Sequence, residues 1–571
     1  MSTHVAFRRQ PVPPQGAMQA QVTSLPAPTR GIIQSENDAF MQPGAAIVLD
    51  NWMPTMQGIR LRGGCEKWCA LPEQIPVISS FEYKSGITER MFAANDTKLY
   101  EVTYTTPIEV KAGQQSGNYA ASQLSNAAGD WLIAVNDAGD FPLRYDGTSW
   151  EVMDAAYVPP AGKPSKITVN LTKYPGANVQ NGRNLTYVCK YRRRLFFIEL
   201  NSMNAWYLPL DAVGGELEMI PLSGSATKGG RLLFCATWSI DAGDGIDDKL
   251  VFCSDLGELL IFTGSDPGNA ANWRQEGRYD VPAPMGMNAH ILVGGDLLIA
   301  TVTGIVPTSA SITKDGAQLE LAAVTRNIKR MWREHVIAKR NWAWTMKKWD
   351  EFGGIFVTVP GGKGPNRMCL AVNDATGAWC RMPGYDATCF LKIGNDLFFG
   401  TQDGRIMQAD RTGYDDGEYY TATMVGGWGA LSTQPAMTVW TQARASFFTK
   451  SGEPFLPQLS ACTDFVVRIP AAPSAGPDVG VEDVWDQGKW GPAGSGVPPD
   501  KVPTPEEKER YAQWGQASTR VTSIKSTMWV SIGTTGYTHA PVVQVTVGQQ
   551  AKPNVELISI DAIHARGGVN V

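Results

Sequence analysis

The sequence predicts a mainly β fold: a β-propeller of six or seven blades, with an inserted helix and a β-rich platform domain built from both chain ends. The first observation behind this is a phrase that recurs along the first two thirds of the 571 residues. An apolar run is followed by polar residues, a tight turn and another apolar run, as expected of hairpins. Recurrence at roughly 40–60 residues is typical of four-stranded propeller blades. The polar parts of the copies are Asn95 and Asp96, Asn136 and Asp137, Asn201, Ser254 and Asp255, Thr303 and Gly304, and Gln402 and Asp403.

Composition is the second observation. The chain has 59 Gly and 37 Pro, together with 18 Trp, 17 Tyr and 19 Phe, which suits many short strands and turns. Its net charge of −5 excludes a generally basic nucleic-acid binder, although a local basic surface stays open. We expect no membrane span, because no run of 18 or more apolar residues occurs. The N-terminus has no signal-peptide core, so we expect a protein made in a cytosol and kept there at least until something else carries it out.

Four regions follow from these patterns. We expect an extended N-terminal arm at 1–30, the first part of the platform at 31–75, the propeller at 76–410 and the second part of the platform at 411–571. A Pro- and Gly-rich insertion at 470–516 interrupts the last region, and a loop of this length is usually functional or disordered. The arm is rich in proline, so it is either a disordered tail or a segment that orders against a neighbouring subunit.

One amphipathic helix is predicted at 317–340, where Leu321, Val324, Ile328 and Met331 follow the helical spacing. The strongest charge cluster of the chain lies on this helix and just after it, interleaved with tryptophans. One exposed basic face would suit contact with phosphates. The alternative is a solvated helix face beside a subunit interface. The two interpretations, DNA contact and subunit interface, are both true if the face lines a channel shared by several subunits. The residues are Arg326, Lys329, Arg330, Arg333, Lys339, Arg340, Lys347 and Lys348.

The sequence offers no catalytic constellation, and we expect neither an enzyme nor a cofactor. The five histidines are far apart, and neither a nucleophile elbow nor a phosphate-binding loop is present. The acidic turn at 241–248 lacks the ligand spacing of a full calcium loop, so a solvated turn is favoured. Cys65 and Cys69 lack a second ligand pair for zinc. The nine cysteines are expected to be mostly buried, reduced thiols.

Several phrases together resemble the tail nozzle, or packaged-DNA stabilisation, proteins of short-tailed bacteriophages. They occur in the expected order from about residue 30 to the C-terminus. The opening phrase is an Asn-aromatic-x-Pro turn followed by an Arg-x-Gly strand end, and a later phrase is an Arg-aromatic blade. A Gly-Ile-Val-Pro blade end at 304–307 and a closing strand at 553–568 follow. The residues that carry the first two phrases are Asn51, Trp52, Pro54, Arg60, Arg62, Arg194, Phe196 and Phe197.

This resemblance implies a homo-oligomeric ring, typically a hexamer, below the portal and its adaptor in the tail of the virion. It implies assembly in the host cytoplasm, retention of packaged double-stranded DNA, conduction of that DNA during ejection, and surfaces for fibres or spikes. The insertion at 470–516 departs from the core pattern of the family. Two other functions stay open. One is a propeller enzyme or glycan-binding module acting on host surface polysaccharide, and the other is a cytosolic propeller scaffold.

Overall fold

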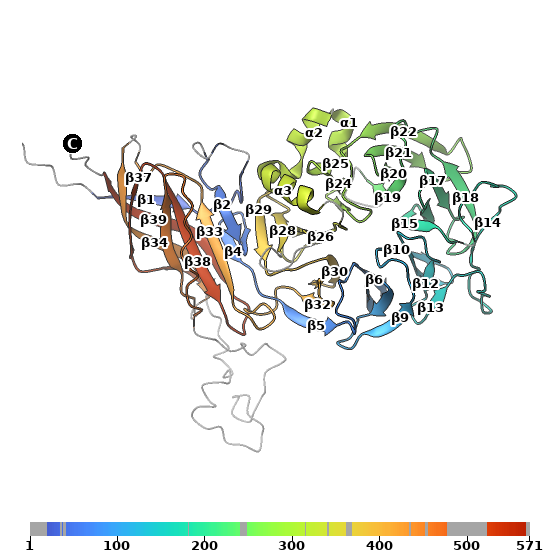
Figure 1. Ribbon diagram of the computed structural model, residues 1–571, viewed down its shortest axis with the longest axis horizontal. Coiled ribbons are helices and arrows are strands. Elements are labelled where there is room, and N and C mark those ends of the chain that lie inside the picture. Colours follow the sequence, from blue (N-terminus) through green and yellow to red (C-terminus); the bar gives the residue numbers. More distant parts are fainter. Residues whose placement is uncertain are drawn as a thin grey trace, which may run out of the picture.

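The computed structural model describes residues 20–34, 37, 41–180, 182–239, 248–314, 316–339, 342–360, 368–432, 436–450, 455–476 and 522–566. Figure 1 shows a wheel of small sheets beside a stack of longer strands, to which both ends of the described chain belong. The protein is therefore mainly β, with a propeller and a platform, as the sequence predicts. No helix among these residues is long and apolar enough to cross a bilayer.

Six blades of the wheel are sheets of their own. The first two comprise β6 (Ser79–Ser85), β7 (Thr88–Ala94), β8 (Lys98–Glu101) and β9 (Ile108–Ala112), and β10 (Tyr119–Asn126), β11 (Gly129–Asn136), β12 (Leu143–Tyr145) and β13 (Trp150–Val152). The third comprises β14 (Ile167–Val169), β15 (Leu185–Tyr191), β16 (Arg194–Glu199), β17 (Asn204–Tyr207) and β18 (Gly215–Pro221). The fourth and fifth comprise β19 (Leu232–Trp238), β20 (Lys249–Ser254), β21 (Glu258–Gly264) and β22 (Trp273–Asp280), and β23 (His290–Val293), β24 (Asp296–Ala300) and β25 (Ile305–Pro307).

The last of these six blades closes the wheel. It comprises β30 (Cys389–Ile393), β31 (Asp396–Gly400), β32 (Arg405–Gln408) and, from the start of the chain, β5 (Glu66–Ala70). β5 pairs antiparallel with β32, so residues 66–70 belong to the propeller and not to the platform region predicted at 31–75. Without β5, the strand β32 would be an unpaired sheet edge. Backbone hydrogen bonds to this early strand cover that edge, which is why residues 66–70 belong to the last blade.

A seventh radial sheet is shared with the platform. It comprises β26 (Met346–Trp349), β27 (Gly354–Thr358), β28 (Met368–Asn373) and β29 (Trp379–Pro383), and it forms one half of an eight-stranded sheet. Successive inner strands touch around the wheel, from β6 through β10, β15 and β19 to the sheet of β23, and on through β26 and β30 back to β6. The prediction of six or seven blades is confirmed: six blades are sheets of their own, and one further radial sheet continues into the platform.

The platform is a sandwich built from both chain ends. Its first sheet continues from β29 through β2 (Ala46–Asp50), β33 (Tyr420–Gly426), β38 (His539–Val547) and β35 (Gln458–Thr463). Its second sheet comprises β1 (Gln21–Pro26), β3 (Trp52–Pro54), β4 (Ile59–Leu61), β34 (Thr438–Lys450), β36 (Thr522–Ser526), β37 (Val530–Gly536) and β39 (Val555–Arg566). Met424 and Val543 of the first sheet share one buried cluster with Phe447 and Leu557 of the second.

The proline-rich arm is partly a strand. β1 pairs antiparallel with β39 over Gln21–Pro26, so the last part of the predicted arm orders against the protein's own platform. The earlier part of the arm and most of the predicted insertion, at 477–516, lie outside the described residues.

The recurring phrase forms the hairpin between the second and third strands of a blade, as predicted. In every copy, a polar residue at the end of the second strand or directly after it is buried, and its side chain bonds to groups of the segment that follows. The Asn95 side-chain oxygen accepts from the backbone N–H groups of Thr97 and Lys98 at 3.1 and 2.8 Å. The Ser254 hydroxyl accepts from the Glu258 N–H at 3.0 Å. The buried residues are Asn95, Asn136, Glu199, Ser254, Thr301 and Thr401.

The helical insertion is broken into four short pieces between β25 and β26. They are α1 (Thr308–Thr313), α2 (Gly316–Ala322), the 3-10 helix η2 (Val324–Ile328) and α3 (Lys329–Lys339). The predicted single helix at 317–340 is therefore wrong in its continuity. Ile328 and Met331 are buried as expected. Leu321 is 64% exposed, because the helix breaks before η2 and α2 therefore does not continue the apolar face of α3.

Candidate functional site

The basic face of the insertion consists of Arg326, Lys329, Arg330 and Arg333, which are all exposed. Lys329 pairs with Glu320 at 2.6 Å and Arg330 with Glu334 at 3.3 Å. These pairs are open to solvent, so each contributes little to stability and is easily exchanged for another anion. Within the described part of the chain, Arg326 and Arg333 have no ion-pair partner. We call these four side chains the basic face.

The rest of the predicted basic cluster does not join this face. Lys339 is buried and donates to the Val359 carbonyl at 3.2 Å, and burial lowers the pKa of its ammonium group. Lys347 lies 3.7 Å from Glu82, and Lys348 pairs with Asp350 and Asp374 at 3.0 and 3.5 Å. Arg340 lies outside the described residues. Spacing alone did not show this division, because the chain leaves the helix after Lys339 and the following lysines sit on β26.

The tryptophans interleaved with the cluster belong mainly to the core. Trp332, Trp344 and Trp349 are buried, and each indole N–H donates to a backbone carbonyl. Trp342 differs, since it is 46% exposed. Only this last indole is therefore available to a ligand.

Arg62 lies at the junction between platform and propeller. Its Nε donates to the Asn51 side-chain oxygen at 2.7 Å, and Nη2 donates to the Pro383 carbonyl at the end of β29 at 2.8 Å. Nη1 and Nη2 also donate to the two carboxylate oxygens of Asp415 at 2.8 and 2.6 Å. Burial opposes the charge of Arg62, but Asp415 outweighs it, and the pKa of the guanidinium is raised above its ordinary value. The positive φ of 62° at Asn51 suits asparagine.

The other residues of the resemblance also have structural roles. Trp52 is buried, the Pro54 carbonyl accepts from Asn373 at 3.0 Å, and Arg60 lies over the Phe352 ring at 4.6 Å. Arg194 reaches Asp266 at 3.3 Å. In the same strand, Phe196 and Phe197 are fully buried and point into two different clusters. Side chains of this kind fix the fold and its domain junction; they do not form a binding surface.

A cavity of about 500 Å³ lies on the propeller axis. Residues at or just before the innermost strands β6, β10, β15, β19, β23 and β26 line it, together with hairpin residues of three blades. Two of these residues, Asp137 and Asp255, are the second polar residue of the recurring phrase. The phrase predicted a hairpin, but it did not predict that this residue lines a cavity. We call it the axial cavity. Its lining residues are Ile78, Ser116, Asn118, Asp137, Thr186, Leu200, Asn201, Arg231, Leu232, Leu233, Asp255, Pro284, Met285, Gly286, Met287, Trp342 and Ala343.

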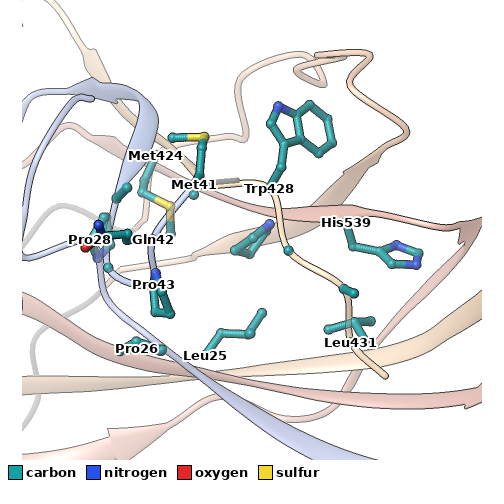
Figure 2. Close-up of a pocket in the computed structure, with 17 residues that line it drawn as sticks. Leu25, Pro26, Pro28, Met41, Gln42, Pro43, Met424, Trp428, Leu431 and His539 are labelled. Carbon is teal, nitrogen blue, oxygen red and sulfur yellow. The ribbon is translucent and has the colours of Figure 1, made fainter. Parts of the chain in front are cut away.

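The platform holds a smaller, mainly apolar pocket of about 170 Å³. Figure 2 shows Leu25, Pro26 and Pro28 of the N-terminal segment around the same space as Met424 and Leu431 of the C-terminal part. This volume is below the range of about 300–1,000 Å³ that is usual for small-molecule sites. The pocket marks where the arm packs on the sandwich.

Neither a metal site nor a reactive thiol is found among the described residues. No group of three or more His, Cys, Asp or Glu there is placed to hold a metal ion. Cys65 and Cys69 are buried free thiols, and burial raises the pKa of Cys69 to about 12, which disfavours the thiolate that zinc requires. Most of the acidic turn at 241–248 lies outside the described residues. All nine cysteines are free, and all but Cys189 are buried, which confirms that prediction.

Comparisons with known proteins give no family. No family model matches the chain, and no curated protein matches it. Among solved structures, a computationally designed protein, Ika8, has 8% identity and a TM-score of 0.33, over 60% of this chain and 99% of its own. YCF48 bound to a D1 peptide has 11% identity and a TM-score of 0.34, over 65% and 99%. YCF48 from Cyanidioschyzon merolae has 11% identity and a TM-score of 0.32, over 60% and 98%. The fold described above rests on strand pairing and owes nothing to these distant similarities.

Proposed function

We propose that the protein is a structural virion component, a subunit of the tail nozzle ring of a short-tailed bacteriophage. The ring is a homo-oligomer, with six copies expected, that retains packaged double-stranded DNA and conducts it during ejection. It is assembled in the host cytoplasm and then sits in the virion tail. There it contacts the portal or adaptor on one side and carries fibre or spike proteins on the other. The protein itself needs no cofactor and catalyses no reaction.

The basic face is the observation that carries this proposal. Arg326 and Arg333 are exposed and have no ion-pair partner within the described residues, although the whole chain has a net charge of −5. Each phosphate that a protein neutralises adds affinity for DNA, so a conduit that was basic throughout would hold its cargo. A mildly acidic body with one small basic face gives contact without permanent capture.

The junction supports the proposal in a second way. Asn51 and Arg62, from the phrase that resembles the opening of nozzle proteins, hydrogen-bond to each other where the platform meets the propeller. A ring that withstands the pressure of packaged DNA needs its two domains held in one orientation. The bonds from Arg62 to Pro383 and Asp415 meet that need, because they join segments more than 300 positions apart in the chain.

The test is to replace Arg326, Arg330 and Arg333 together with Gln in the phage. We expect rings to assemble in normal amounts, while genome retention or ejection is impaired, because the DNA contact is lost. The matched control replaces Lys84, Lys173 and Arg193 with Gln, which removes the same charge from exposed blade surfaces. If the first variant fails to form rings, the basic face is a subunit interface. If both variants impair ejection equally, net charge and not this face is responsible.

A further inference from the structure

The axial cavity has the size and position of a ligand site. Its volume of about 500 Å³ lies within the range of about 300–1,000 Å³ that is usual for small-molecule sites. Residues at or just before the inner strands of six successive sheets contribute to it, so it lies where the blades converge. Polar and apolar groups both line it. This site is separate from the basic face and does not depend on the tail-nozzle proposal.

Its polar groups are held in place before any ligand arrives. Arg231 donates from Nη1 to the Asn201 side-chain oxygen at 2.8 Å, and its Nε lies 3.5 Å from Asp255. In the preceding blade, Asn118 donates to Asp137 at 2.9 Å and accepts from Asn288 at 3.1 Å. Side chains fixed in this way lose little freedom on binding, which is the physical basis of preorganisation.

The charged residues that line the axial cavity determine which ligand charge it accepts. The lining holds two carboxylates, Asp137 and Asp255, and one guanidinium, Arg231, which pairs with Asp255. A phosphate or another strong anion would meet net repulsion here. Each carboxylate and amide still has lone pairs beyond the bonds described, so hydroxyl groups would find acceptors as well as donors.

The apolar part of the lining gives the cavity an aromatic wall. Trp342 is 46% exposed, unlike Trp332 and Trp344 in the neighbouring segments, which are buried. An exposed indole offers a large, rigid apolar face at small entropic cost, and Met285 and Met287 line the same cavity. A pyranose matches this combination, because one of its faces consists of C–H groups and its rim of hydroxyl groups.

From these observations we infer that the axial cavity binds a neutral saccharide of one or two pyranose units. Its apolar face stacks on Trp342, and its hydroxyl groups bond to Asp137, Asn118 and the Arg231–Asp255 pair. No covalent step is involved. The function we infer for this cavity is sugar binding without catalysis.

Saturation-transfer NMR on the full chain tests this inference, with glucose, galactose, N-acetylglucosamine and the disaccharides cellobiose, lactose and chitobiose as probes. We expect at least one of them to bind with a Kd of about 0.1–10 mM. Trp342→Ala should weaken that binding at least about tenfold, and Asp137→Asn about three- to tenfold, since each removes one kind of contact. Glucose 6-phosphate and spermidine serve as charged probes, and neither should bind more tightly than the sugar.

The matched control is Trp529→Ala, which removes another exposed indole, on the platform between β36 and β37. It should leave the sugar affinity within about twofold of the native value. The inference is overturned if none of the six sugars binds at about 20 mM. It is also overturned if Trp342→Ala and Asp137→Asn, each shown to be folded by circular dichroism, bind as the native protein does. Tighter binding of spermidine would identify a site for cations instead.

Discussion

Arg62 and Asp415 lie 353 positions apart in the chain, yet the Arg62 guanidinium donates to both carboxylate oxygens of Asp415. The guanidinium is also enclosed by the rings of Tyr385 and Tyr420, whose centroids are 4.3 and 4.2 Å from it. Arg62 is fully buried, so its charge depends on this one carboxylate for compensation. The pair therefore couples the end of β4 to the segment that leads from the last blade into β33.

Replacing Asp415 with Asn should destabilise the protein by about 3–5 kcal/mol, because it leaves a buried guanidinium without its counter-charge. The free energy of unfolding in urea is the measurement. Asp211→Asn is the matched control, since Asp211 pairs with Arg193 at an exposed site, and its loss should cost less than about 1 kcal/mol. Equal losses in the two variants would contradict the role of Arg62 as the anchor of the junction.

The buried polar residue of the recurring phrase should matter more than its exposed neighbour. Asn136 donates to the Ser116 carbonyl at 2.9 Å and accepts from the Asp140 N–H at 3.0 Å. Asn136→Ala leaves both groups unpaired and should cost about 1–3 kcal/mol, measured as a lower Tm. Asp96→Ala, at an exposed turn position, should change stability by no more than about 0.5 kcal/mol. A similar Tm for both variants would show that the hairpin does not need its polar residue.

Stability should fall as the pH is lowered from about 6.5 to about 4, in part because of His290. Burial against Phe234, at 4.2 Å between ring centroids, lowers the pKa of His290 from 6.5 to about 4. The unfolded chain thus binds the proton at a higher pH than the native protein does, and acid favours unfolding across this window. His335, His539 and His564 shift in the same direction, because of burial.

His290→Gln removes one of these titrations, so it should reduce the loss of stability between pH 7 and pH 4.5 by about 2 kcal/mol. Urea unfolding at the two pH values measures this difference in one protein, which separates it from any constant effect of the substitution. An unchanged difference would mean that His290 titrates normally in the folded protein.

The sequence was informative where a local rule decides the structure. A polar pair between two apolar runs predicts a hairpin. Asn136 and Ser254 accordingly end the second strand of a blade, and Asn95 directly follows one. The closing strand expected at 553–568 is likewise present, as β39.

Contacts between residues far apart in the chain could not be predicted from the sequence. Nothing near Glu66–Ala70 reveals that this strand closes the wheel against β32, because its partner lies far along the chain. The basic cluster was divided by tertiary packing, which buried Lys339 and left Arg333 in solvent. The axial cavity could not be foreseen, since it exists only once several blades bring Asp137, Arg231 and Trp342 to one axis.

Electron microscopy of the assembled particle, with this protein labelled, tests the central claim most directly. We predict a closed ring of copies, six being expected, coaxial with a short phage tail and placed with α3 and its basic face toward the lumen. A label that lies on no ring, or a ring that holds the basic face away from the DNA path, would contradict the proposal that this propeller protein is part of a conduit.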